Sequence, residues 1–378
     1  MKVLSLFDGM ACGMIAMQIA GVEVESYDAY EIDKYAIKTA QHNFPMIKEH
    51  GDVFEADFTQ YEGVDFLVGG SPCTYWSIAQ TKNRETVASG MGWELFSQYV
   101  RALHEAKPKY FIYENNKTMS KQIRASIDDA FGFEAVLINS ALVSAQNRQR
   151  LYWVGRRNED GTYSKVNVEQ PADRGILLKD VRDAFVDCAG GRTMAAEPVR
   201  CMQYELKEAY VRDSGCVARL DMPKCHDILT RIYGWNGKCP TLTAHGGGNT
   251  EPKVFDCYSV CFNYSIEFDD DGRPIKAIGK DGKKITIYEV RDGKITIKGK
   301  QYPIKLKDGY YIIRKLTVSE SKRLQTVPEW YEFPVSNSQA YKMLGNGWTC
   351  EVIRHLINSC FKSTDVLPGQ IEMEGFDG

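Results

Sequence analysis

Short apolar segments alternate with helical patterns through about the first 155 residues, and this alternation constrains the fold more than any other feature. The sequence predicts strands at 3–7, 24–30, 64–68, 110–113 and 151–154, separated by helices at 14–20, 34–43, 93–105 and 121–131. Such alternation is typical of a mostly parallel, doubly wound sheet. Sheets of this kind bind ligands at the carboxyl ends of their strands, so we expect the functional residues there.

The alternation ends near Arg157, and the chain is irregular from there to about Lys315. Asp-Gly pairs begin at 271, 281, 292 and 308, and each predicts a hairpin turn because type I′ turns need positive φ. Alternating polar and apolar residues at 285–288 and 295–297 predict half-buried strands. We therefore expect a β-rich second domain, followed by helices at 317–326 and 339–361, the second of which returns to the first domain.

The formal net charge of −3 gives no sign of a polyanionic partner, but the charge is unevenly distributed. Residues 271–315 contain 13 Lys and Arg against 5 Asp and Glu, an excess of +8 that leaves −11 for the rest of the chain. A basic β-rich module on an acidic α/β body is consistent with polyanion binding. On charge alone, a solvated hairpin surface explains the excess equally well.

The eleven cysteines are odd in number and include no C-x2-C pair, so we expect reduced thiols and neither a disulfide framework nor a metal site. The N-terminus lacks the pattern of a signal peptide. No apolar run reaches the roughly 18 residues of a membrane span. These features predict a cytoplasmic protein without a membrane partner.

Three segments at the expected strand ends favour an adenosyl cofactor. Residues 7–13, Phe-Asp-Gly-Met-Ala-Cys-Gly, join the first strand to the first helix, where small residues let backbone N–H groups approach a ligand. Glu31 ends the second strand, where a carboxylate can bind ribose hydroxyls, and Asp52 and Val53 follow a third strand. Each acid alone could equally be a helix cap, but the three in this order favour a nucleoside.

Cys73 follows the apolar strand 64–68 on a Gly-Gly-Ser-Pro turn, which would present its thiol at the carboxyl edge of the sheet. A single cysteine is more often a buried apolar residue, but at a ligand edge it can act as a nucleophile. Glu114 follows strand 110–113 at the same edge, which places an acid beside the thiol. Arg148 and Arg150 are two residues apart and so share a face of an extended chain. They could contact the phosphates and bases of a nucleic acid, or they could be ordinary surface residues.

Taken in order, these motifs resemble those of the DNA (cytosine-5) methyltransferases. The matching segments are Phe7-Asp8-Gly9, Pro72-Cys73, Glu114-Asn115, Gln146 to Arg150, Arg314 to Gln325 and Gln339 to Asn346. They span residues 3 to about 361, nearly the whole chain. Some details are similar to the animal de novo branch, whereas Asn346 follows the bacterial pattern, so the mixture suggests a phage or bacterial enzyme, of the kind found in restriction-modification.

The resemblance implies an α/β fold, a Rossmann-like S-adenosylmethionine-dependent methyltransferase sheet with an inserted β-rich target recognition domain. It implies a catalytic domain at 1–158 and 314–378 and a recognition domain at 159–313. The implied catalytic residues are Cys73, Glu114, Arg148 and Arg150. The implied contacts to S-adenosyl-L-methionine are Phe7, Asp8, Gly9, Met10, Cys12, Glu31, Ile32, Asp52, Val53, Gly70, Pro72, Leu95, Asn346 and Trp348. The implied contacts to double-stranded DNA are Ser77, Thr243, Gly246, Gly247 and Gly248.

The chemistry implied by the resemblance begins with cytosine flipped out of the duplex. The Cys73 thiolate adds to C6, so that C5 attacks the methyl group of the donor. Glu114 bonds or protonates N3, and Arg150 holds the O2 edge with Arg148 in support. Residues 79–92 would form the loop that closes over the base. No obligate protein partner is expected.

Three alternatives stay open. Thr74, Asn116 and Gly347 depart from the family pattern, and an altered donor such as carboxy-S-adenosylmethionine could meet Asn116 or Lys117. The chain could also act on cytosine in transfer RNA, although the long basic domain favours DNA. An inactive DNA-binding homologue is the third alternative, and the intact catalytic motifs argue against it.

Overall fold

The computed structural model describes residues 1–78, 84–183, 199–209, 215–223, 225, 227–244, 251–260 and 264–362. The chain divides into two compact units, and each is described by itself. Unit 1 comprises Met1–Asn139, Gln149–Ala172 and Trp348–Gly378. Unit 2 comprises Ser140–Arg148 and Asp173–Gly347. Among the described residues, no helix combines the length and apolar character needed to cross a membrane.

Unit 1 is built on an eight-stranded sheet in the order β3-β2-β1-β4-β5-β8-β6, with β9 paired to β8. Its strands are β1 Lys2–Leu6, β2 Ser26–Tyr30, β3 Lys48–Glu49, β4 Phe66–Gly69, β5 Tyr110–Asn116, β6 Val136–Asn139, β8 Gln149–Arg157 and β9 Tyr163–Lys165. The five strands from β3 to β5 are parallel, and β8 runs antiparallel to β5. Strand order reverses between β1 and β4, which is where a doubly wound sheet opens a ligand crevice.

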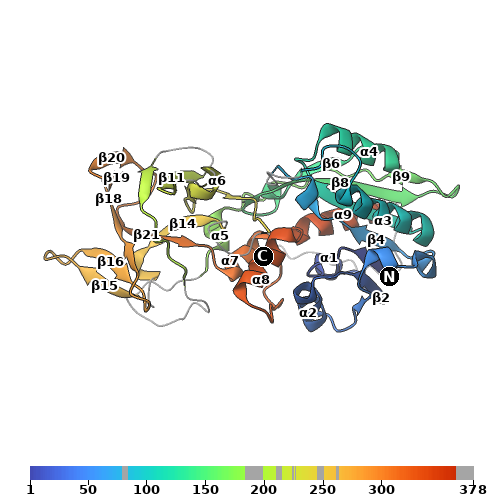
Figure 1. Ribbon diagram of the computed structural model, residues 1–378, viewed down its shortest axis with the longest axis horizontal. Helices are drawn as coiled ribbons and strands as arrows, with labels where there is room; N and C mark the ends of the chain where they lie inside the picture. The colour runs from blue at the N-terminus through green and yellow to red at the C-terminus, as the bar shows by residue number, and fades with distance from the viewer. Residues whose placement is uncertain are drawn as a thin grey trace, which may run out of the picture. The chain divides into compact units, whose positions relative to one another are not determined.

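The helices of unit 1 confirm the sequence pattern closely. They are α1 Cys12–Ile19, α2 Lys34–Asn43, α3 Met91–Ala106, α4 Lys121–Phe131 and α9 Cys350–Lys362. Local capping explains two of the boundaries, because Asp33 accepts a hydrogen bond from Tyr35 N and Ser120 accepts one from Ile123 N. Helices α1 and α9 lie side by side although they come from opposite ends of the chain (Figure 1). Short 3-10 helices follow the strands at Val53–Glu55, Phe58–Tyr61 and Cys73–Tyr75.

Unit 2 is β-rich, as the turn signals predicted. Its main sheet has the order β10-β11-β12-β14-β21-β18-β19-β20, beside a three-stranded sheet β15-β16-β17 and a β7-β13 pair. The strands are β7 Gln146–Asn147, β10 Leu206–Ala209, β11 Cys216–Leu220, β12 Arg231–Tyr233, β13 Cys239–Pro240, β14 Lys253–Cys257, β15 Ser265–Phe268, β16 Pro274–Ile278, β17 Lys284–Thr286, β18 Tyr288–Arg291, β19 Lys294–Ile297, β20 Lys300–Pro303 and β21 Gly309–Lys315. Alternate residues of these strands face an apolar core.

Three of the four Asp-Gly pairs lie in hairpins, and the fourth prediction is wrong. Asp292 and Gly293 join β18 to β19 with φ of 51° and 66°, as a type I′ turn requires. Asp308-Gly309 instead opens β21, and the Asp308 carboxylate accepts the N–H groups of Asp292 and Gly293. A further turn, which was not predicted, lies at Lys298 and Gly299, whose φ values are 48° and 77°.

The single helix expected at 339–361 is two helices in different units. Helix α8 spans Asn337–Asn346 in unit 2, whereas α9 begins at Cys350 in unit 1. Gly347 ends α8 with an extended backbone, φ −65° and ψ 166°, so the helix cannot continue. Residues 314–347 therefore pack with the β-rich part, and the compact division differs from the expected boundaries at 158 and 314.

A buried ion-pair cluster joins β14, β21 and α7 (Val318–Leu324) in unit 2. The Arg314 side chain is 0% exposed, with its Nε 2.7 Å from Asp256 Oδ2 and its Nη2 2.7 Å from Glu320 Oε1. Burial opposes the charge of Arg314, but the bonds to Glu320 and Asp256 outweigh it and raise the pKa of the guanidinium. Glu320 also bonds Thr317 N in a capping box, so the cluster starts helix α7. The remaining short helices of unit 2 are α5 Leu178–Val181 and α6 Asp227–Thr230.

Candidate active site

Cys73 stands at the carboxyl end of β4, as predicted. The strand ends at Gly69, and Cys73 begins a 3-10 turn with a half-buried side chain. The turn is tied to β5, because Ser71 Oγ lies 2.6 Å from Tyr113 OH and Asn115 Nδ2 donates to Ser71 O. The thiol-bearing turn is therefore held against the neighbouring strand.

Glu114 lies against the same turn. A Cβ on Gly70 would stand 2.7 Å from Glu114 O and 3.1 Å from Glu114 Oε2, so only glycine allows the two strand ends to approach this closely. Asn116 extends the connection, since its Nδ2 donates to Cys73 O at 3.3 Å. The acid and the thiol-bearing turn thus share one edge of unit 1.

Two donors hold the Glu114 carboxylate from opposite oxygens. Arg150 Nε is 3.0 Å from Oε1, and Trp348 Nε1 donates to Oε2 at 3.0 Å. The Glu114 and Arg150 side chains are only 11% and 13% exposed, so the pair is largely shielded from water. Trp348 was expected to contact the cofactor, and its bond to Glu114 was not predicted. No local signal indicated a contact across 234 residues.

Arg148 and Arg150 do not share the surroundings that their spacing predicted. The chain leaves β7 at Asn147 and enters β8 at Gln149, so Arg148 interrupts the extended segment. Arg148 is 3% exposed, and its guanidinium donates to the carbonyl oxygens of Gly345, Gly347 and Leu242 within unit 2. Because these bonds anchor the backbone, the structure indicates a scaffold role for Arg148, and its support of Arg150 stays a prediction.

The loop after β1 has the backbone of a ligand cradle. Phe7, Gly9 and Ala11 have φ values of 58°, 60° and 58°, and such strain in non-glycine residues concentrates at functional sites. Glu31 fixes the loop, because its Oε2 accepts Gly9 N at 2.8 Å while its Oε1 accepts the N–H groups of Ile32 and Asp33. A Cβ on Gly9 would meet nothing within 4 Å, so space adjoins the loop.

Asp8 is a buried carboxyl with one unpartnered oxygen. Ser5 Oγ and Tyr27 OH both donate to its Oδ1, at 2.5 and 2.7 Å, whereas Oδ2 is buried without a partner. Burial raises the pKa of Asp8 to about 6, against the opposing effect of these two hydrogen bonds. A ligand that brings a donor or a positive charge to Oδ2 would satisfy it.

The other expected cofactor residues have mixed surroundings. Ile32 is 74% exposed, an unusual state for an isoleucine and one suited to a flat apolar ligand. Asp52 accepts a hydrogen bond from Phe54 N and so caps a short helix. A helix cap was the alternative to cofactor binding for an acid at the end of a strand. Met10, Cys12 and Val53 are buried, Leu95 is partly buried on α3, and Pro72 precedes the Cys73 turn.

Two described residues of unit 2 were expected to contact the DNA or the cofactor. Asn346 is the exposed last residue of α8, and Thr243 is exposed beside the same helix. A Cβ on Gly345 would stand 2.0 Å from Thr243 O, so glycine is required where the two segments cross. Gly246, Gly247 and Gly248 lie outside the described residues, and Ser77 follows Cys73 with its N–H bonded to Cys73 O.

The segment expected to close over the base is described from residue 84 onward. Glu85 connects its two ends, because its Oε2 accepts Trp76 Nε1 at 3.0 Å and its Oε1 accepts Gly92 N at 3.1 Å. Gly90 and Gly92 leave room for this carboxylate, since a Cβ on either would lie within 2.6 Å of it. Residues 79–83 lie outside the described part, and loop closure stays a prediction.

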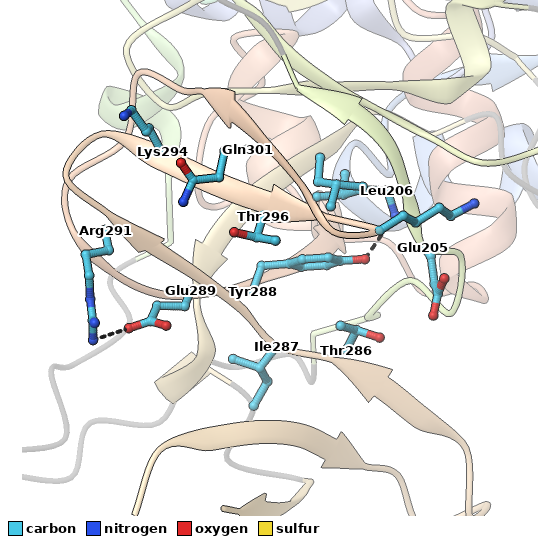
Figure 2. Close-up of a pocket in the computed structure, with 12 residues that line it drawn as sticks. Glu205, Leu206, Thr286, Ile287, Tyr288, Glu289, Arg291, Lys294, Thr296 and Gln301 are labelled. Carbon is cyan, nitrogen blue, oxygen red and sulfur yellow. Dashed lines mark hydrogen bonds and ion pairs between the residues drawn. The ribbon is translucent and has the colours of Figure 1, made fainter. Parts of the chain in front are cut away.

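A pocket of about 560 Å³ lies within unit 2, and its lining includes none of the predicted catalytic residues. Figure 2 shows Tyr288 across its centre, where the phenol oxygen accepts Leu206 N at 3.0 Å. Lys294, Thr296 and Gln301 line it from the β19–β20 hairpin. Most of its lining residues belong to the segment with the charge excess, whereas Glu205 and Leu206 lie outside that segment.

Comparison with known proteins agrees with this geometry. The family model described as C-5 cytosine-specific DNA methylase matches residues 1–362. The orphan methyltransferase M.SPRI of Bacillus phage SPR is 25% identical over 94% of this chain and 96% of its own. The type II methyltransferase M1.ScrFI of Lactococcus lactis subsp. cremoris is 27% identical over 91% of this chain and 74% of its own. The Dnmt2 methyltransferase of S. pombe has a similar structure, with a TM-score of 0.56 and 13% identity over 96% of this chain and 99% of its own, which confirms the fold class.

Proposed function

Because the chain belongs to the C-5 cytosine-specific DNA methylase family, we propose that it flips cytosine out of duplex DNA and transfers a methyl group to C5 from S-adenosyl-L-methionine. The family resemblance drawn from the motifs is confirmed, and the chain is a DNA (cytosine-5-)-methyltransferase. We infer a cytoplasmic site of action, as expected of an enzyme of this kind.

The juxtaposition of the Cys73 turn and Glu114 supports this function best. Cys73 would act as the nucleophile, adding to C6 of the flipped cytosine so that electron density moves to C5. Glu114 would donate a hydrogen bond or a proton to N3 and offset the charge that develops on the ring. After transfer, a base removes the C5 proton and the Cys73–C6 bond breaks, which restores the thiolate.

Arg150 and Trp348 orient the acid in this scheme. Both bond to Glu114, at 3.0 Å each, so the carboxylate is positioned before the base arrives. Arg150 also has the charge and position to hold the O2 edge of the cytosine. Arg148 would act through the backbone carbonyls that it binds, as a positioning residue.

The residues around β1 and β2 fit S-adenosyl-L-methionine, which supplies an electrophilic methyl group when bound. The strained loop at 7–11, the exposed Ile32 and the carboxylate of Glu31 suit a nucleoside. The unpartnered oxygen of Asp8 suits a positively charged group. Gly70, Leu95 and Asn346 stay proposed contacts on the family pattern alone.

The surface charge of unit 2 supports a role in DNA binding, although less strongly than the sequence suggested. Arg314 and Lys315 are buried in ion pairs with Asp256, Glu320 and Glu251, so they add nothing to a DNA-facing surface. Without them, the excess of basic residues in 271–315 falls from +8 to +6. We propose that the rest meets DNA phosphates, with target recognition in the β-rich region.

A transfer assay with labelled donor tests the function directly. The enzyme should label cytosine C5 in duplex DNA, and labelling of transfer RNA but not of DNA would overturn the proposed substrate. Nucleoside mass spectrometry of the product reports the transferred group. A carboxymethyl product would establish the altered donor. The structure lends that alternative no specific support, because Asn116 bonds Cys73 O, Asn115 and Thr118, and Lys117 bonds Gln149.

Replacing Glu114 by Gln should lower the rate of methyl transfer by about 10²–10³-fold, the usual effect of losing one polar group that stabilises developing charge. The amide keeps the shape of the carboxyl but cannot supply a proton to N3. Single-turnover rates with saturating DNA measure the change. Glu94→Gln, an exposed position on α3, is the control and should match the wild type. A Glu114→Gln rate within threefold of wild type would contradict the proposed role.

Replacing Lys294 by Ala should weaken DNA binding to a similar extent for target and non-target duplexes. Lys294 is exposed on β19, and a phosphate contact carries no sequence information. The slope of log Kd against log salt should fall by about one. Lys38→Ala on α2 of unit 1 serves as the matched control. An unchanged slope would rule out a phosphate contact at Lys294.

A further inference from the structure

A carboxyl group that the proposed mechanism does not use lies beside the cofactor loop. Glu49 ends β3 and pairs in register with Ala29 of β2. Asp8 follows β1 and Glu31 follows β2, and the three strands are parallel neighbours in the sheet. Three carboxyl groups are therefore gathered at the carboxyl ends of adjacent strands.

The Glu49 carboxyl is buried and unsatisfied. Both of its oxygens are buried without a hydrogen-bond partner among the described residues, and the same holds for Asp8 Oδ2. Asp8 is only 9% exposed. Native proteins pair almost all buried polar atoms, so three unpaired oxygens in one cluster indicate a missing partner.

Within the part of the chain that the structure describes, the charged groups that act on Glu49 include no cation that could be this partner. The groups that act on it electrostatically are Asp8 and Glu31, both acidic. Lys48 and His50 flank Glu49 in sequence and so lie on the opposite face of the strand. There His50 Nε2 is 2.8 Å from Asp28 Oδ1. On the other side, Tyr27 bonds Asp8 and brings no charge to the cluster.

We propose that Glu49, together with Asp8, makes the enzyme prefer the cationic methyl donor to its demethylated product, an inference that rests on the proposed function. S-adenosylmethionine carries a sulfonium and an ammonium against one carboxylate. S-adenosylhomocysteine lacks the sulfonium and is neutral overall. An acidic cluster without a counterion stabilises the first more than the second, which favours product release after transfer.

The preference should depend on pH with a defined sign. Burial, reinforced by Asp8 and Glu31, raises the pKa of Glu49 to about 8. A bound cation favours the ionised carboxylate and lowers this pKa, so donor binding releases a proton. Affinity for a cationic ligand should therefore rise as the pH increases toward 8 and level off above it. A fall of one pKa unit on binding corresponds to roughly a tenfold gain in affinity.

Calorimetric titration between about pH 7 and 9 tests the inference without turnover. The window lies above the pKa of about 6 for Asp8, so Glu49 dominates the change. The probes are S-adenosylhomocysteine and sinefungin, a non-transferable analogue with an ammonium in place of the methylsulfonium. In the wild type, the Kd of sinefungin divided by the Kd of S-adenosylhomocysteine should fall by about tenfold as the pH rises.

Glu49→Gln should remove most of this shift, whereas Glu55→Gln, which deletes an exposed carboxylate nearby, should keep it. A wild-type ratio that does not change with pH would overturn the inference and leave the transferase function standing, as would an unaltered shift in Glu49→Gln. Failure of both nucleosides to bind would overturn the proposed cofactor and this inference together. The titration of the wild-type enzyme tests the pH dependence of the preference even if the Glu49→Gln variant folds poorly.

Discussion

Replacing Cys73 by Ala should abolish methyl transfer, with a loss of about 10⁴-fold or more, as expected when a covalent nucleophile is removed. Without a thiolate at C6, the cytosine ring remains aromatic and C5 stays a poor nucleophile. The Cys73 side chain is half-buried at the start of a 3-10 turn that Ser71 and Asn115 tie to β5 through backbone and hydroxyl groups. The variant should therefore keep its fold and its cofactor affinity.

Transfer of labelled methyl groups to duplex DNA measures this loss. Cys225→Ser, which changes an exposed thiol in unit 2, is the matched control and should retain activity. A duplex with 5-fluorocytosine at the target adds a second readout. A base cannot remove the C5 fluorine as it removes the C5 proton, so the covalent adduct between the enzyme and the base persists. Wild-type enzyme should form this adduct and Cys73→Ala should not. Residual activity above about a hundredth of wild type would require a different nucleophile.

Replacing Arg314 by Ala should destabilise unit 2 by about 3–5 kcal/mol, the usual cost of leaving buried charges uncompensated. Arg314 is the shared partner of Asp256 and Glu320, which are 1% and 0% exposed. Arg182 also pairs with Asp256, but Glu320 would lose its two guanidinium bonds within the interior. Helix α7 should loosen with them, because Glu320 closes its capping box.

Urea denaturation followed by tryptophan fluorescence measures this effect, since Trp235 lies 5.2 Å from the Arg314 guanidinium. Arg291→Ala is the matched control, because its ion pair with Glu289 is exposed and should contribute less than about 1 kcal/mol. If the two variants lost equal stability, the buried cluster would have no special role in holding β14, β21 and α7 together.

The elements that the sequence predicted well depend on short stretches of chain. Helices 34–43 and 121–131 match their expected bounds, because the caps Asp33 and Ser120 and the apolar periodicity are local. Where two tendencies compete, the prediction was wrong. The helical pattern at 339–361 continues through Gly347, yet its two halves pack in different units and the helix is interrupted between them.

By itself, the sequence determined the alternation of most strands and helices in the first part, the β-rich character of the second part and the motifs that show the family. The tertiary structure decided which of these residues meet. Trp348 reaches Glu114 across 234 positions, and Arg148 donates to backbone carbonyl oxygens of unit 2. Glu49 joins Asp8 and Glu31 through the pairing of β3 with β2. Local patterns specify elements because they act within a few residues, whereas contacts of this range exist only after the strands are aligned and packed.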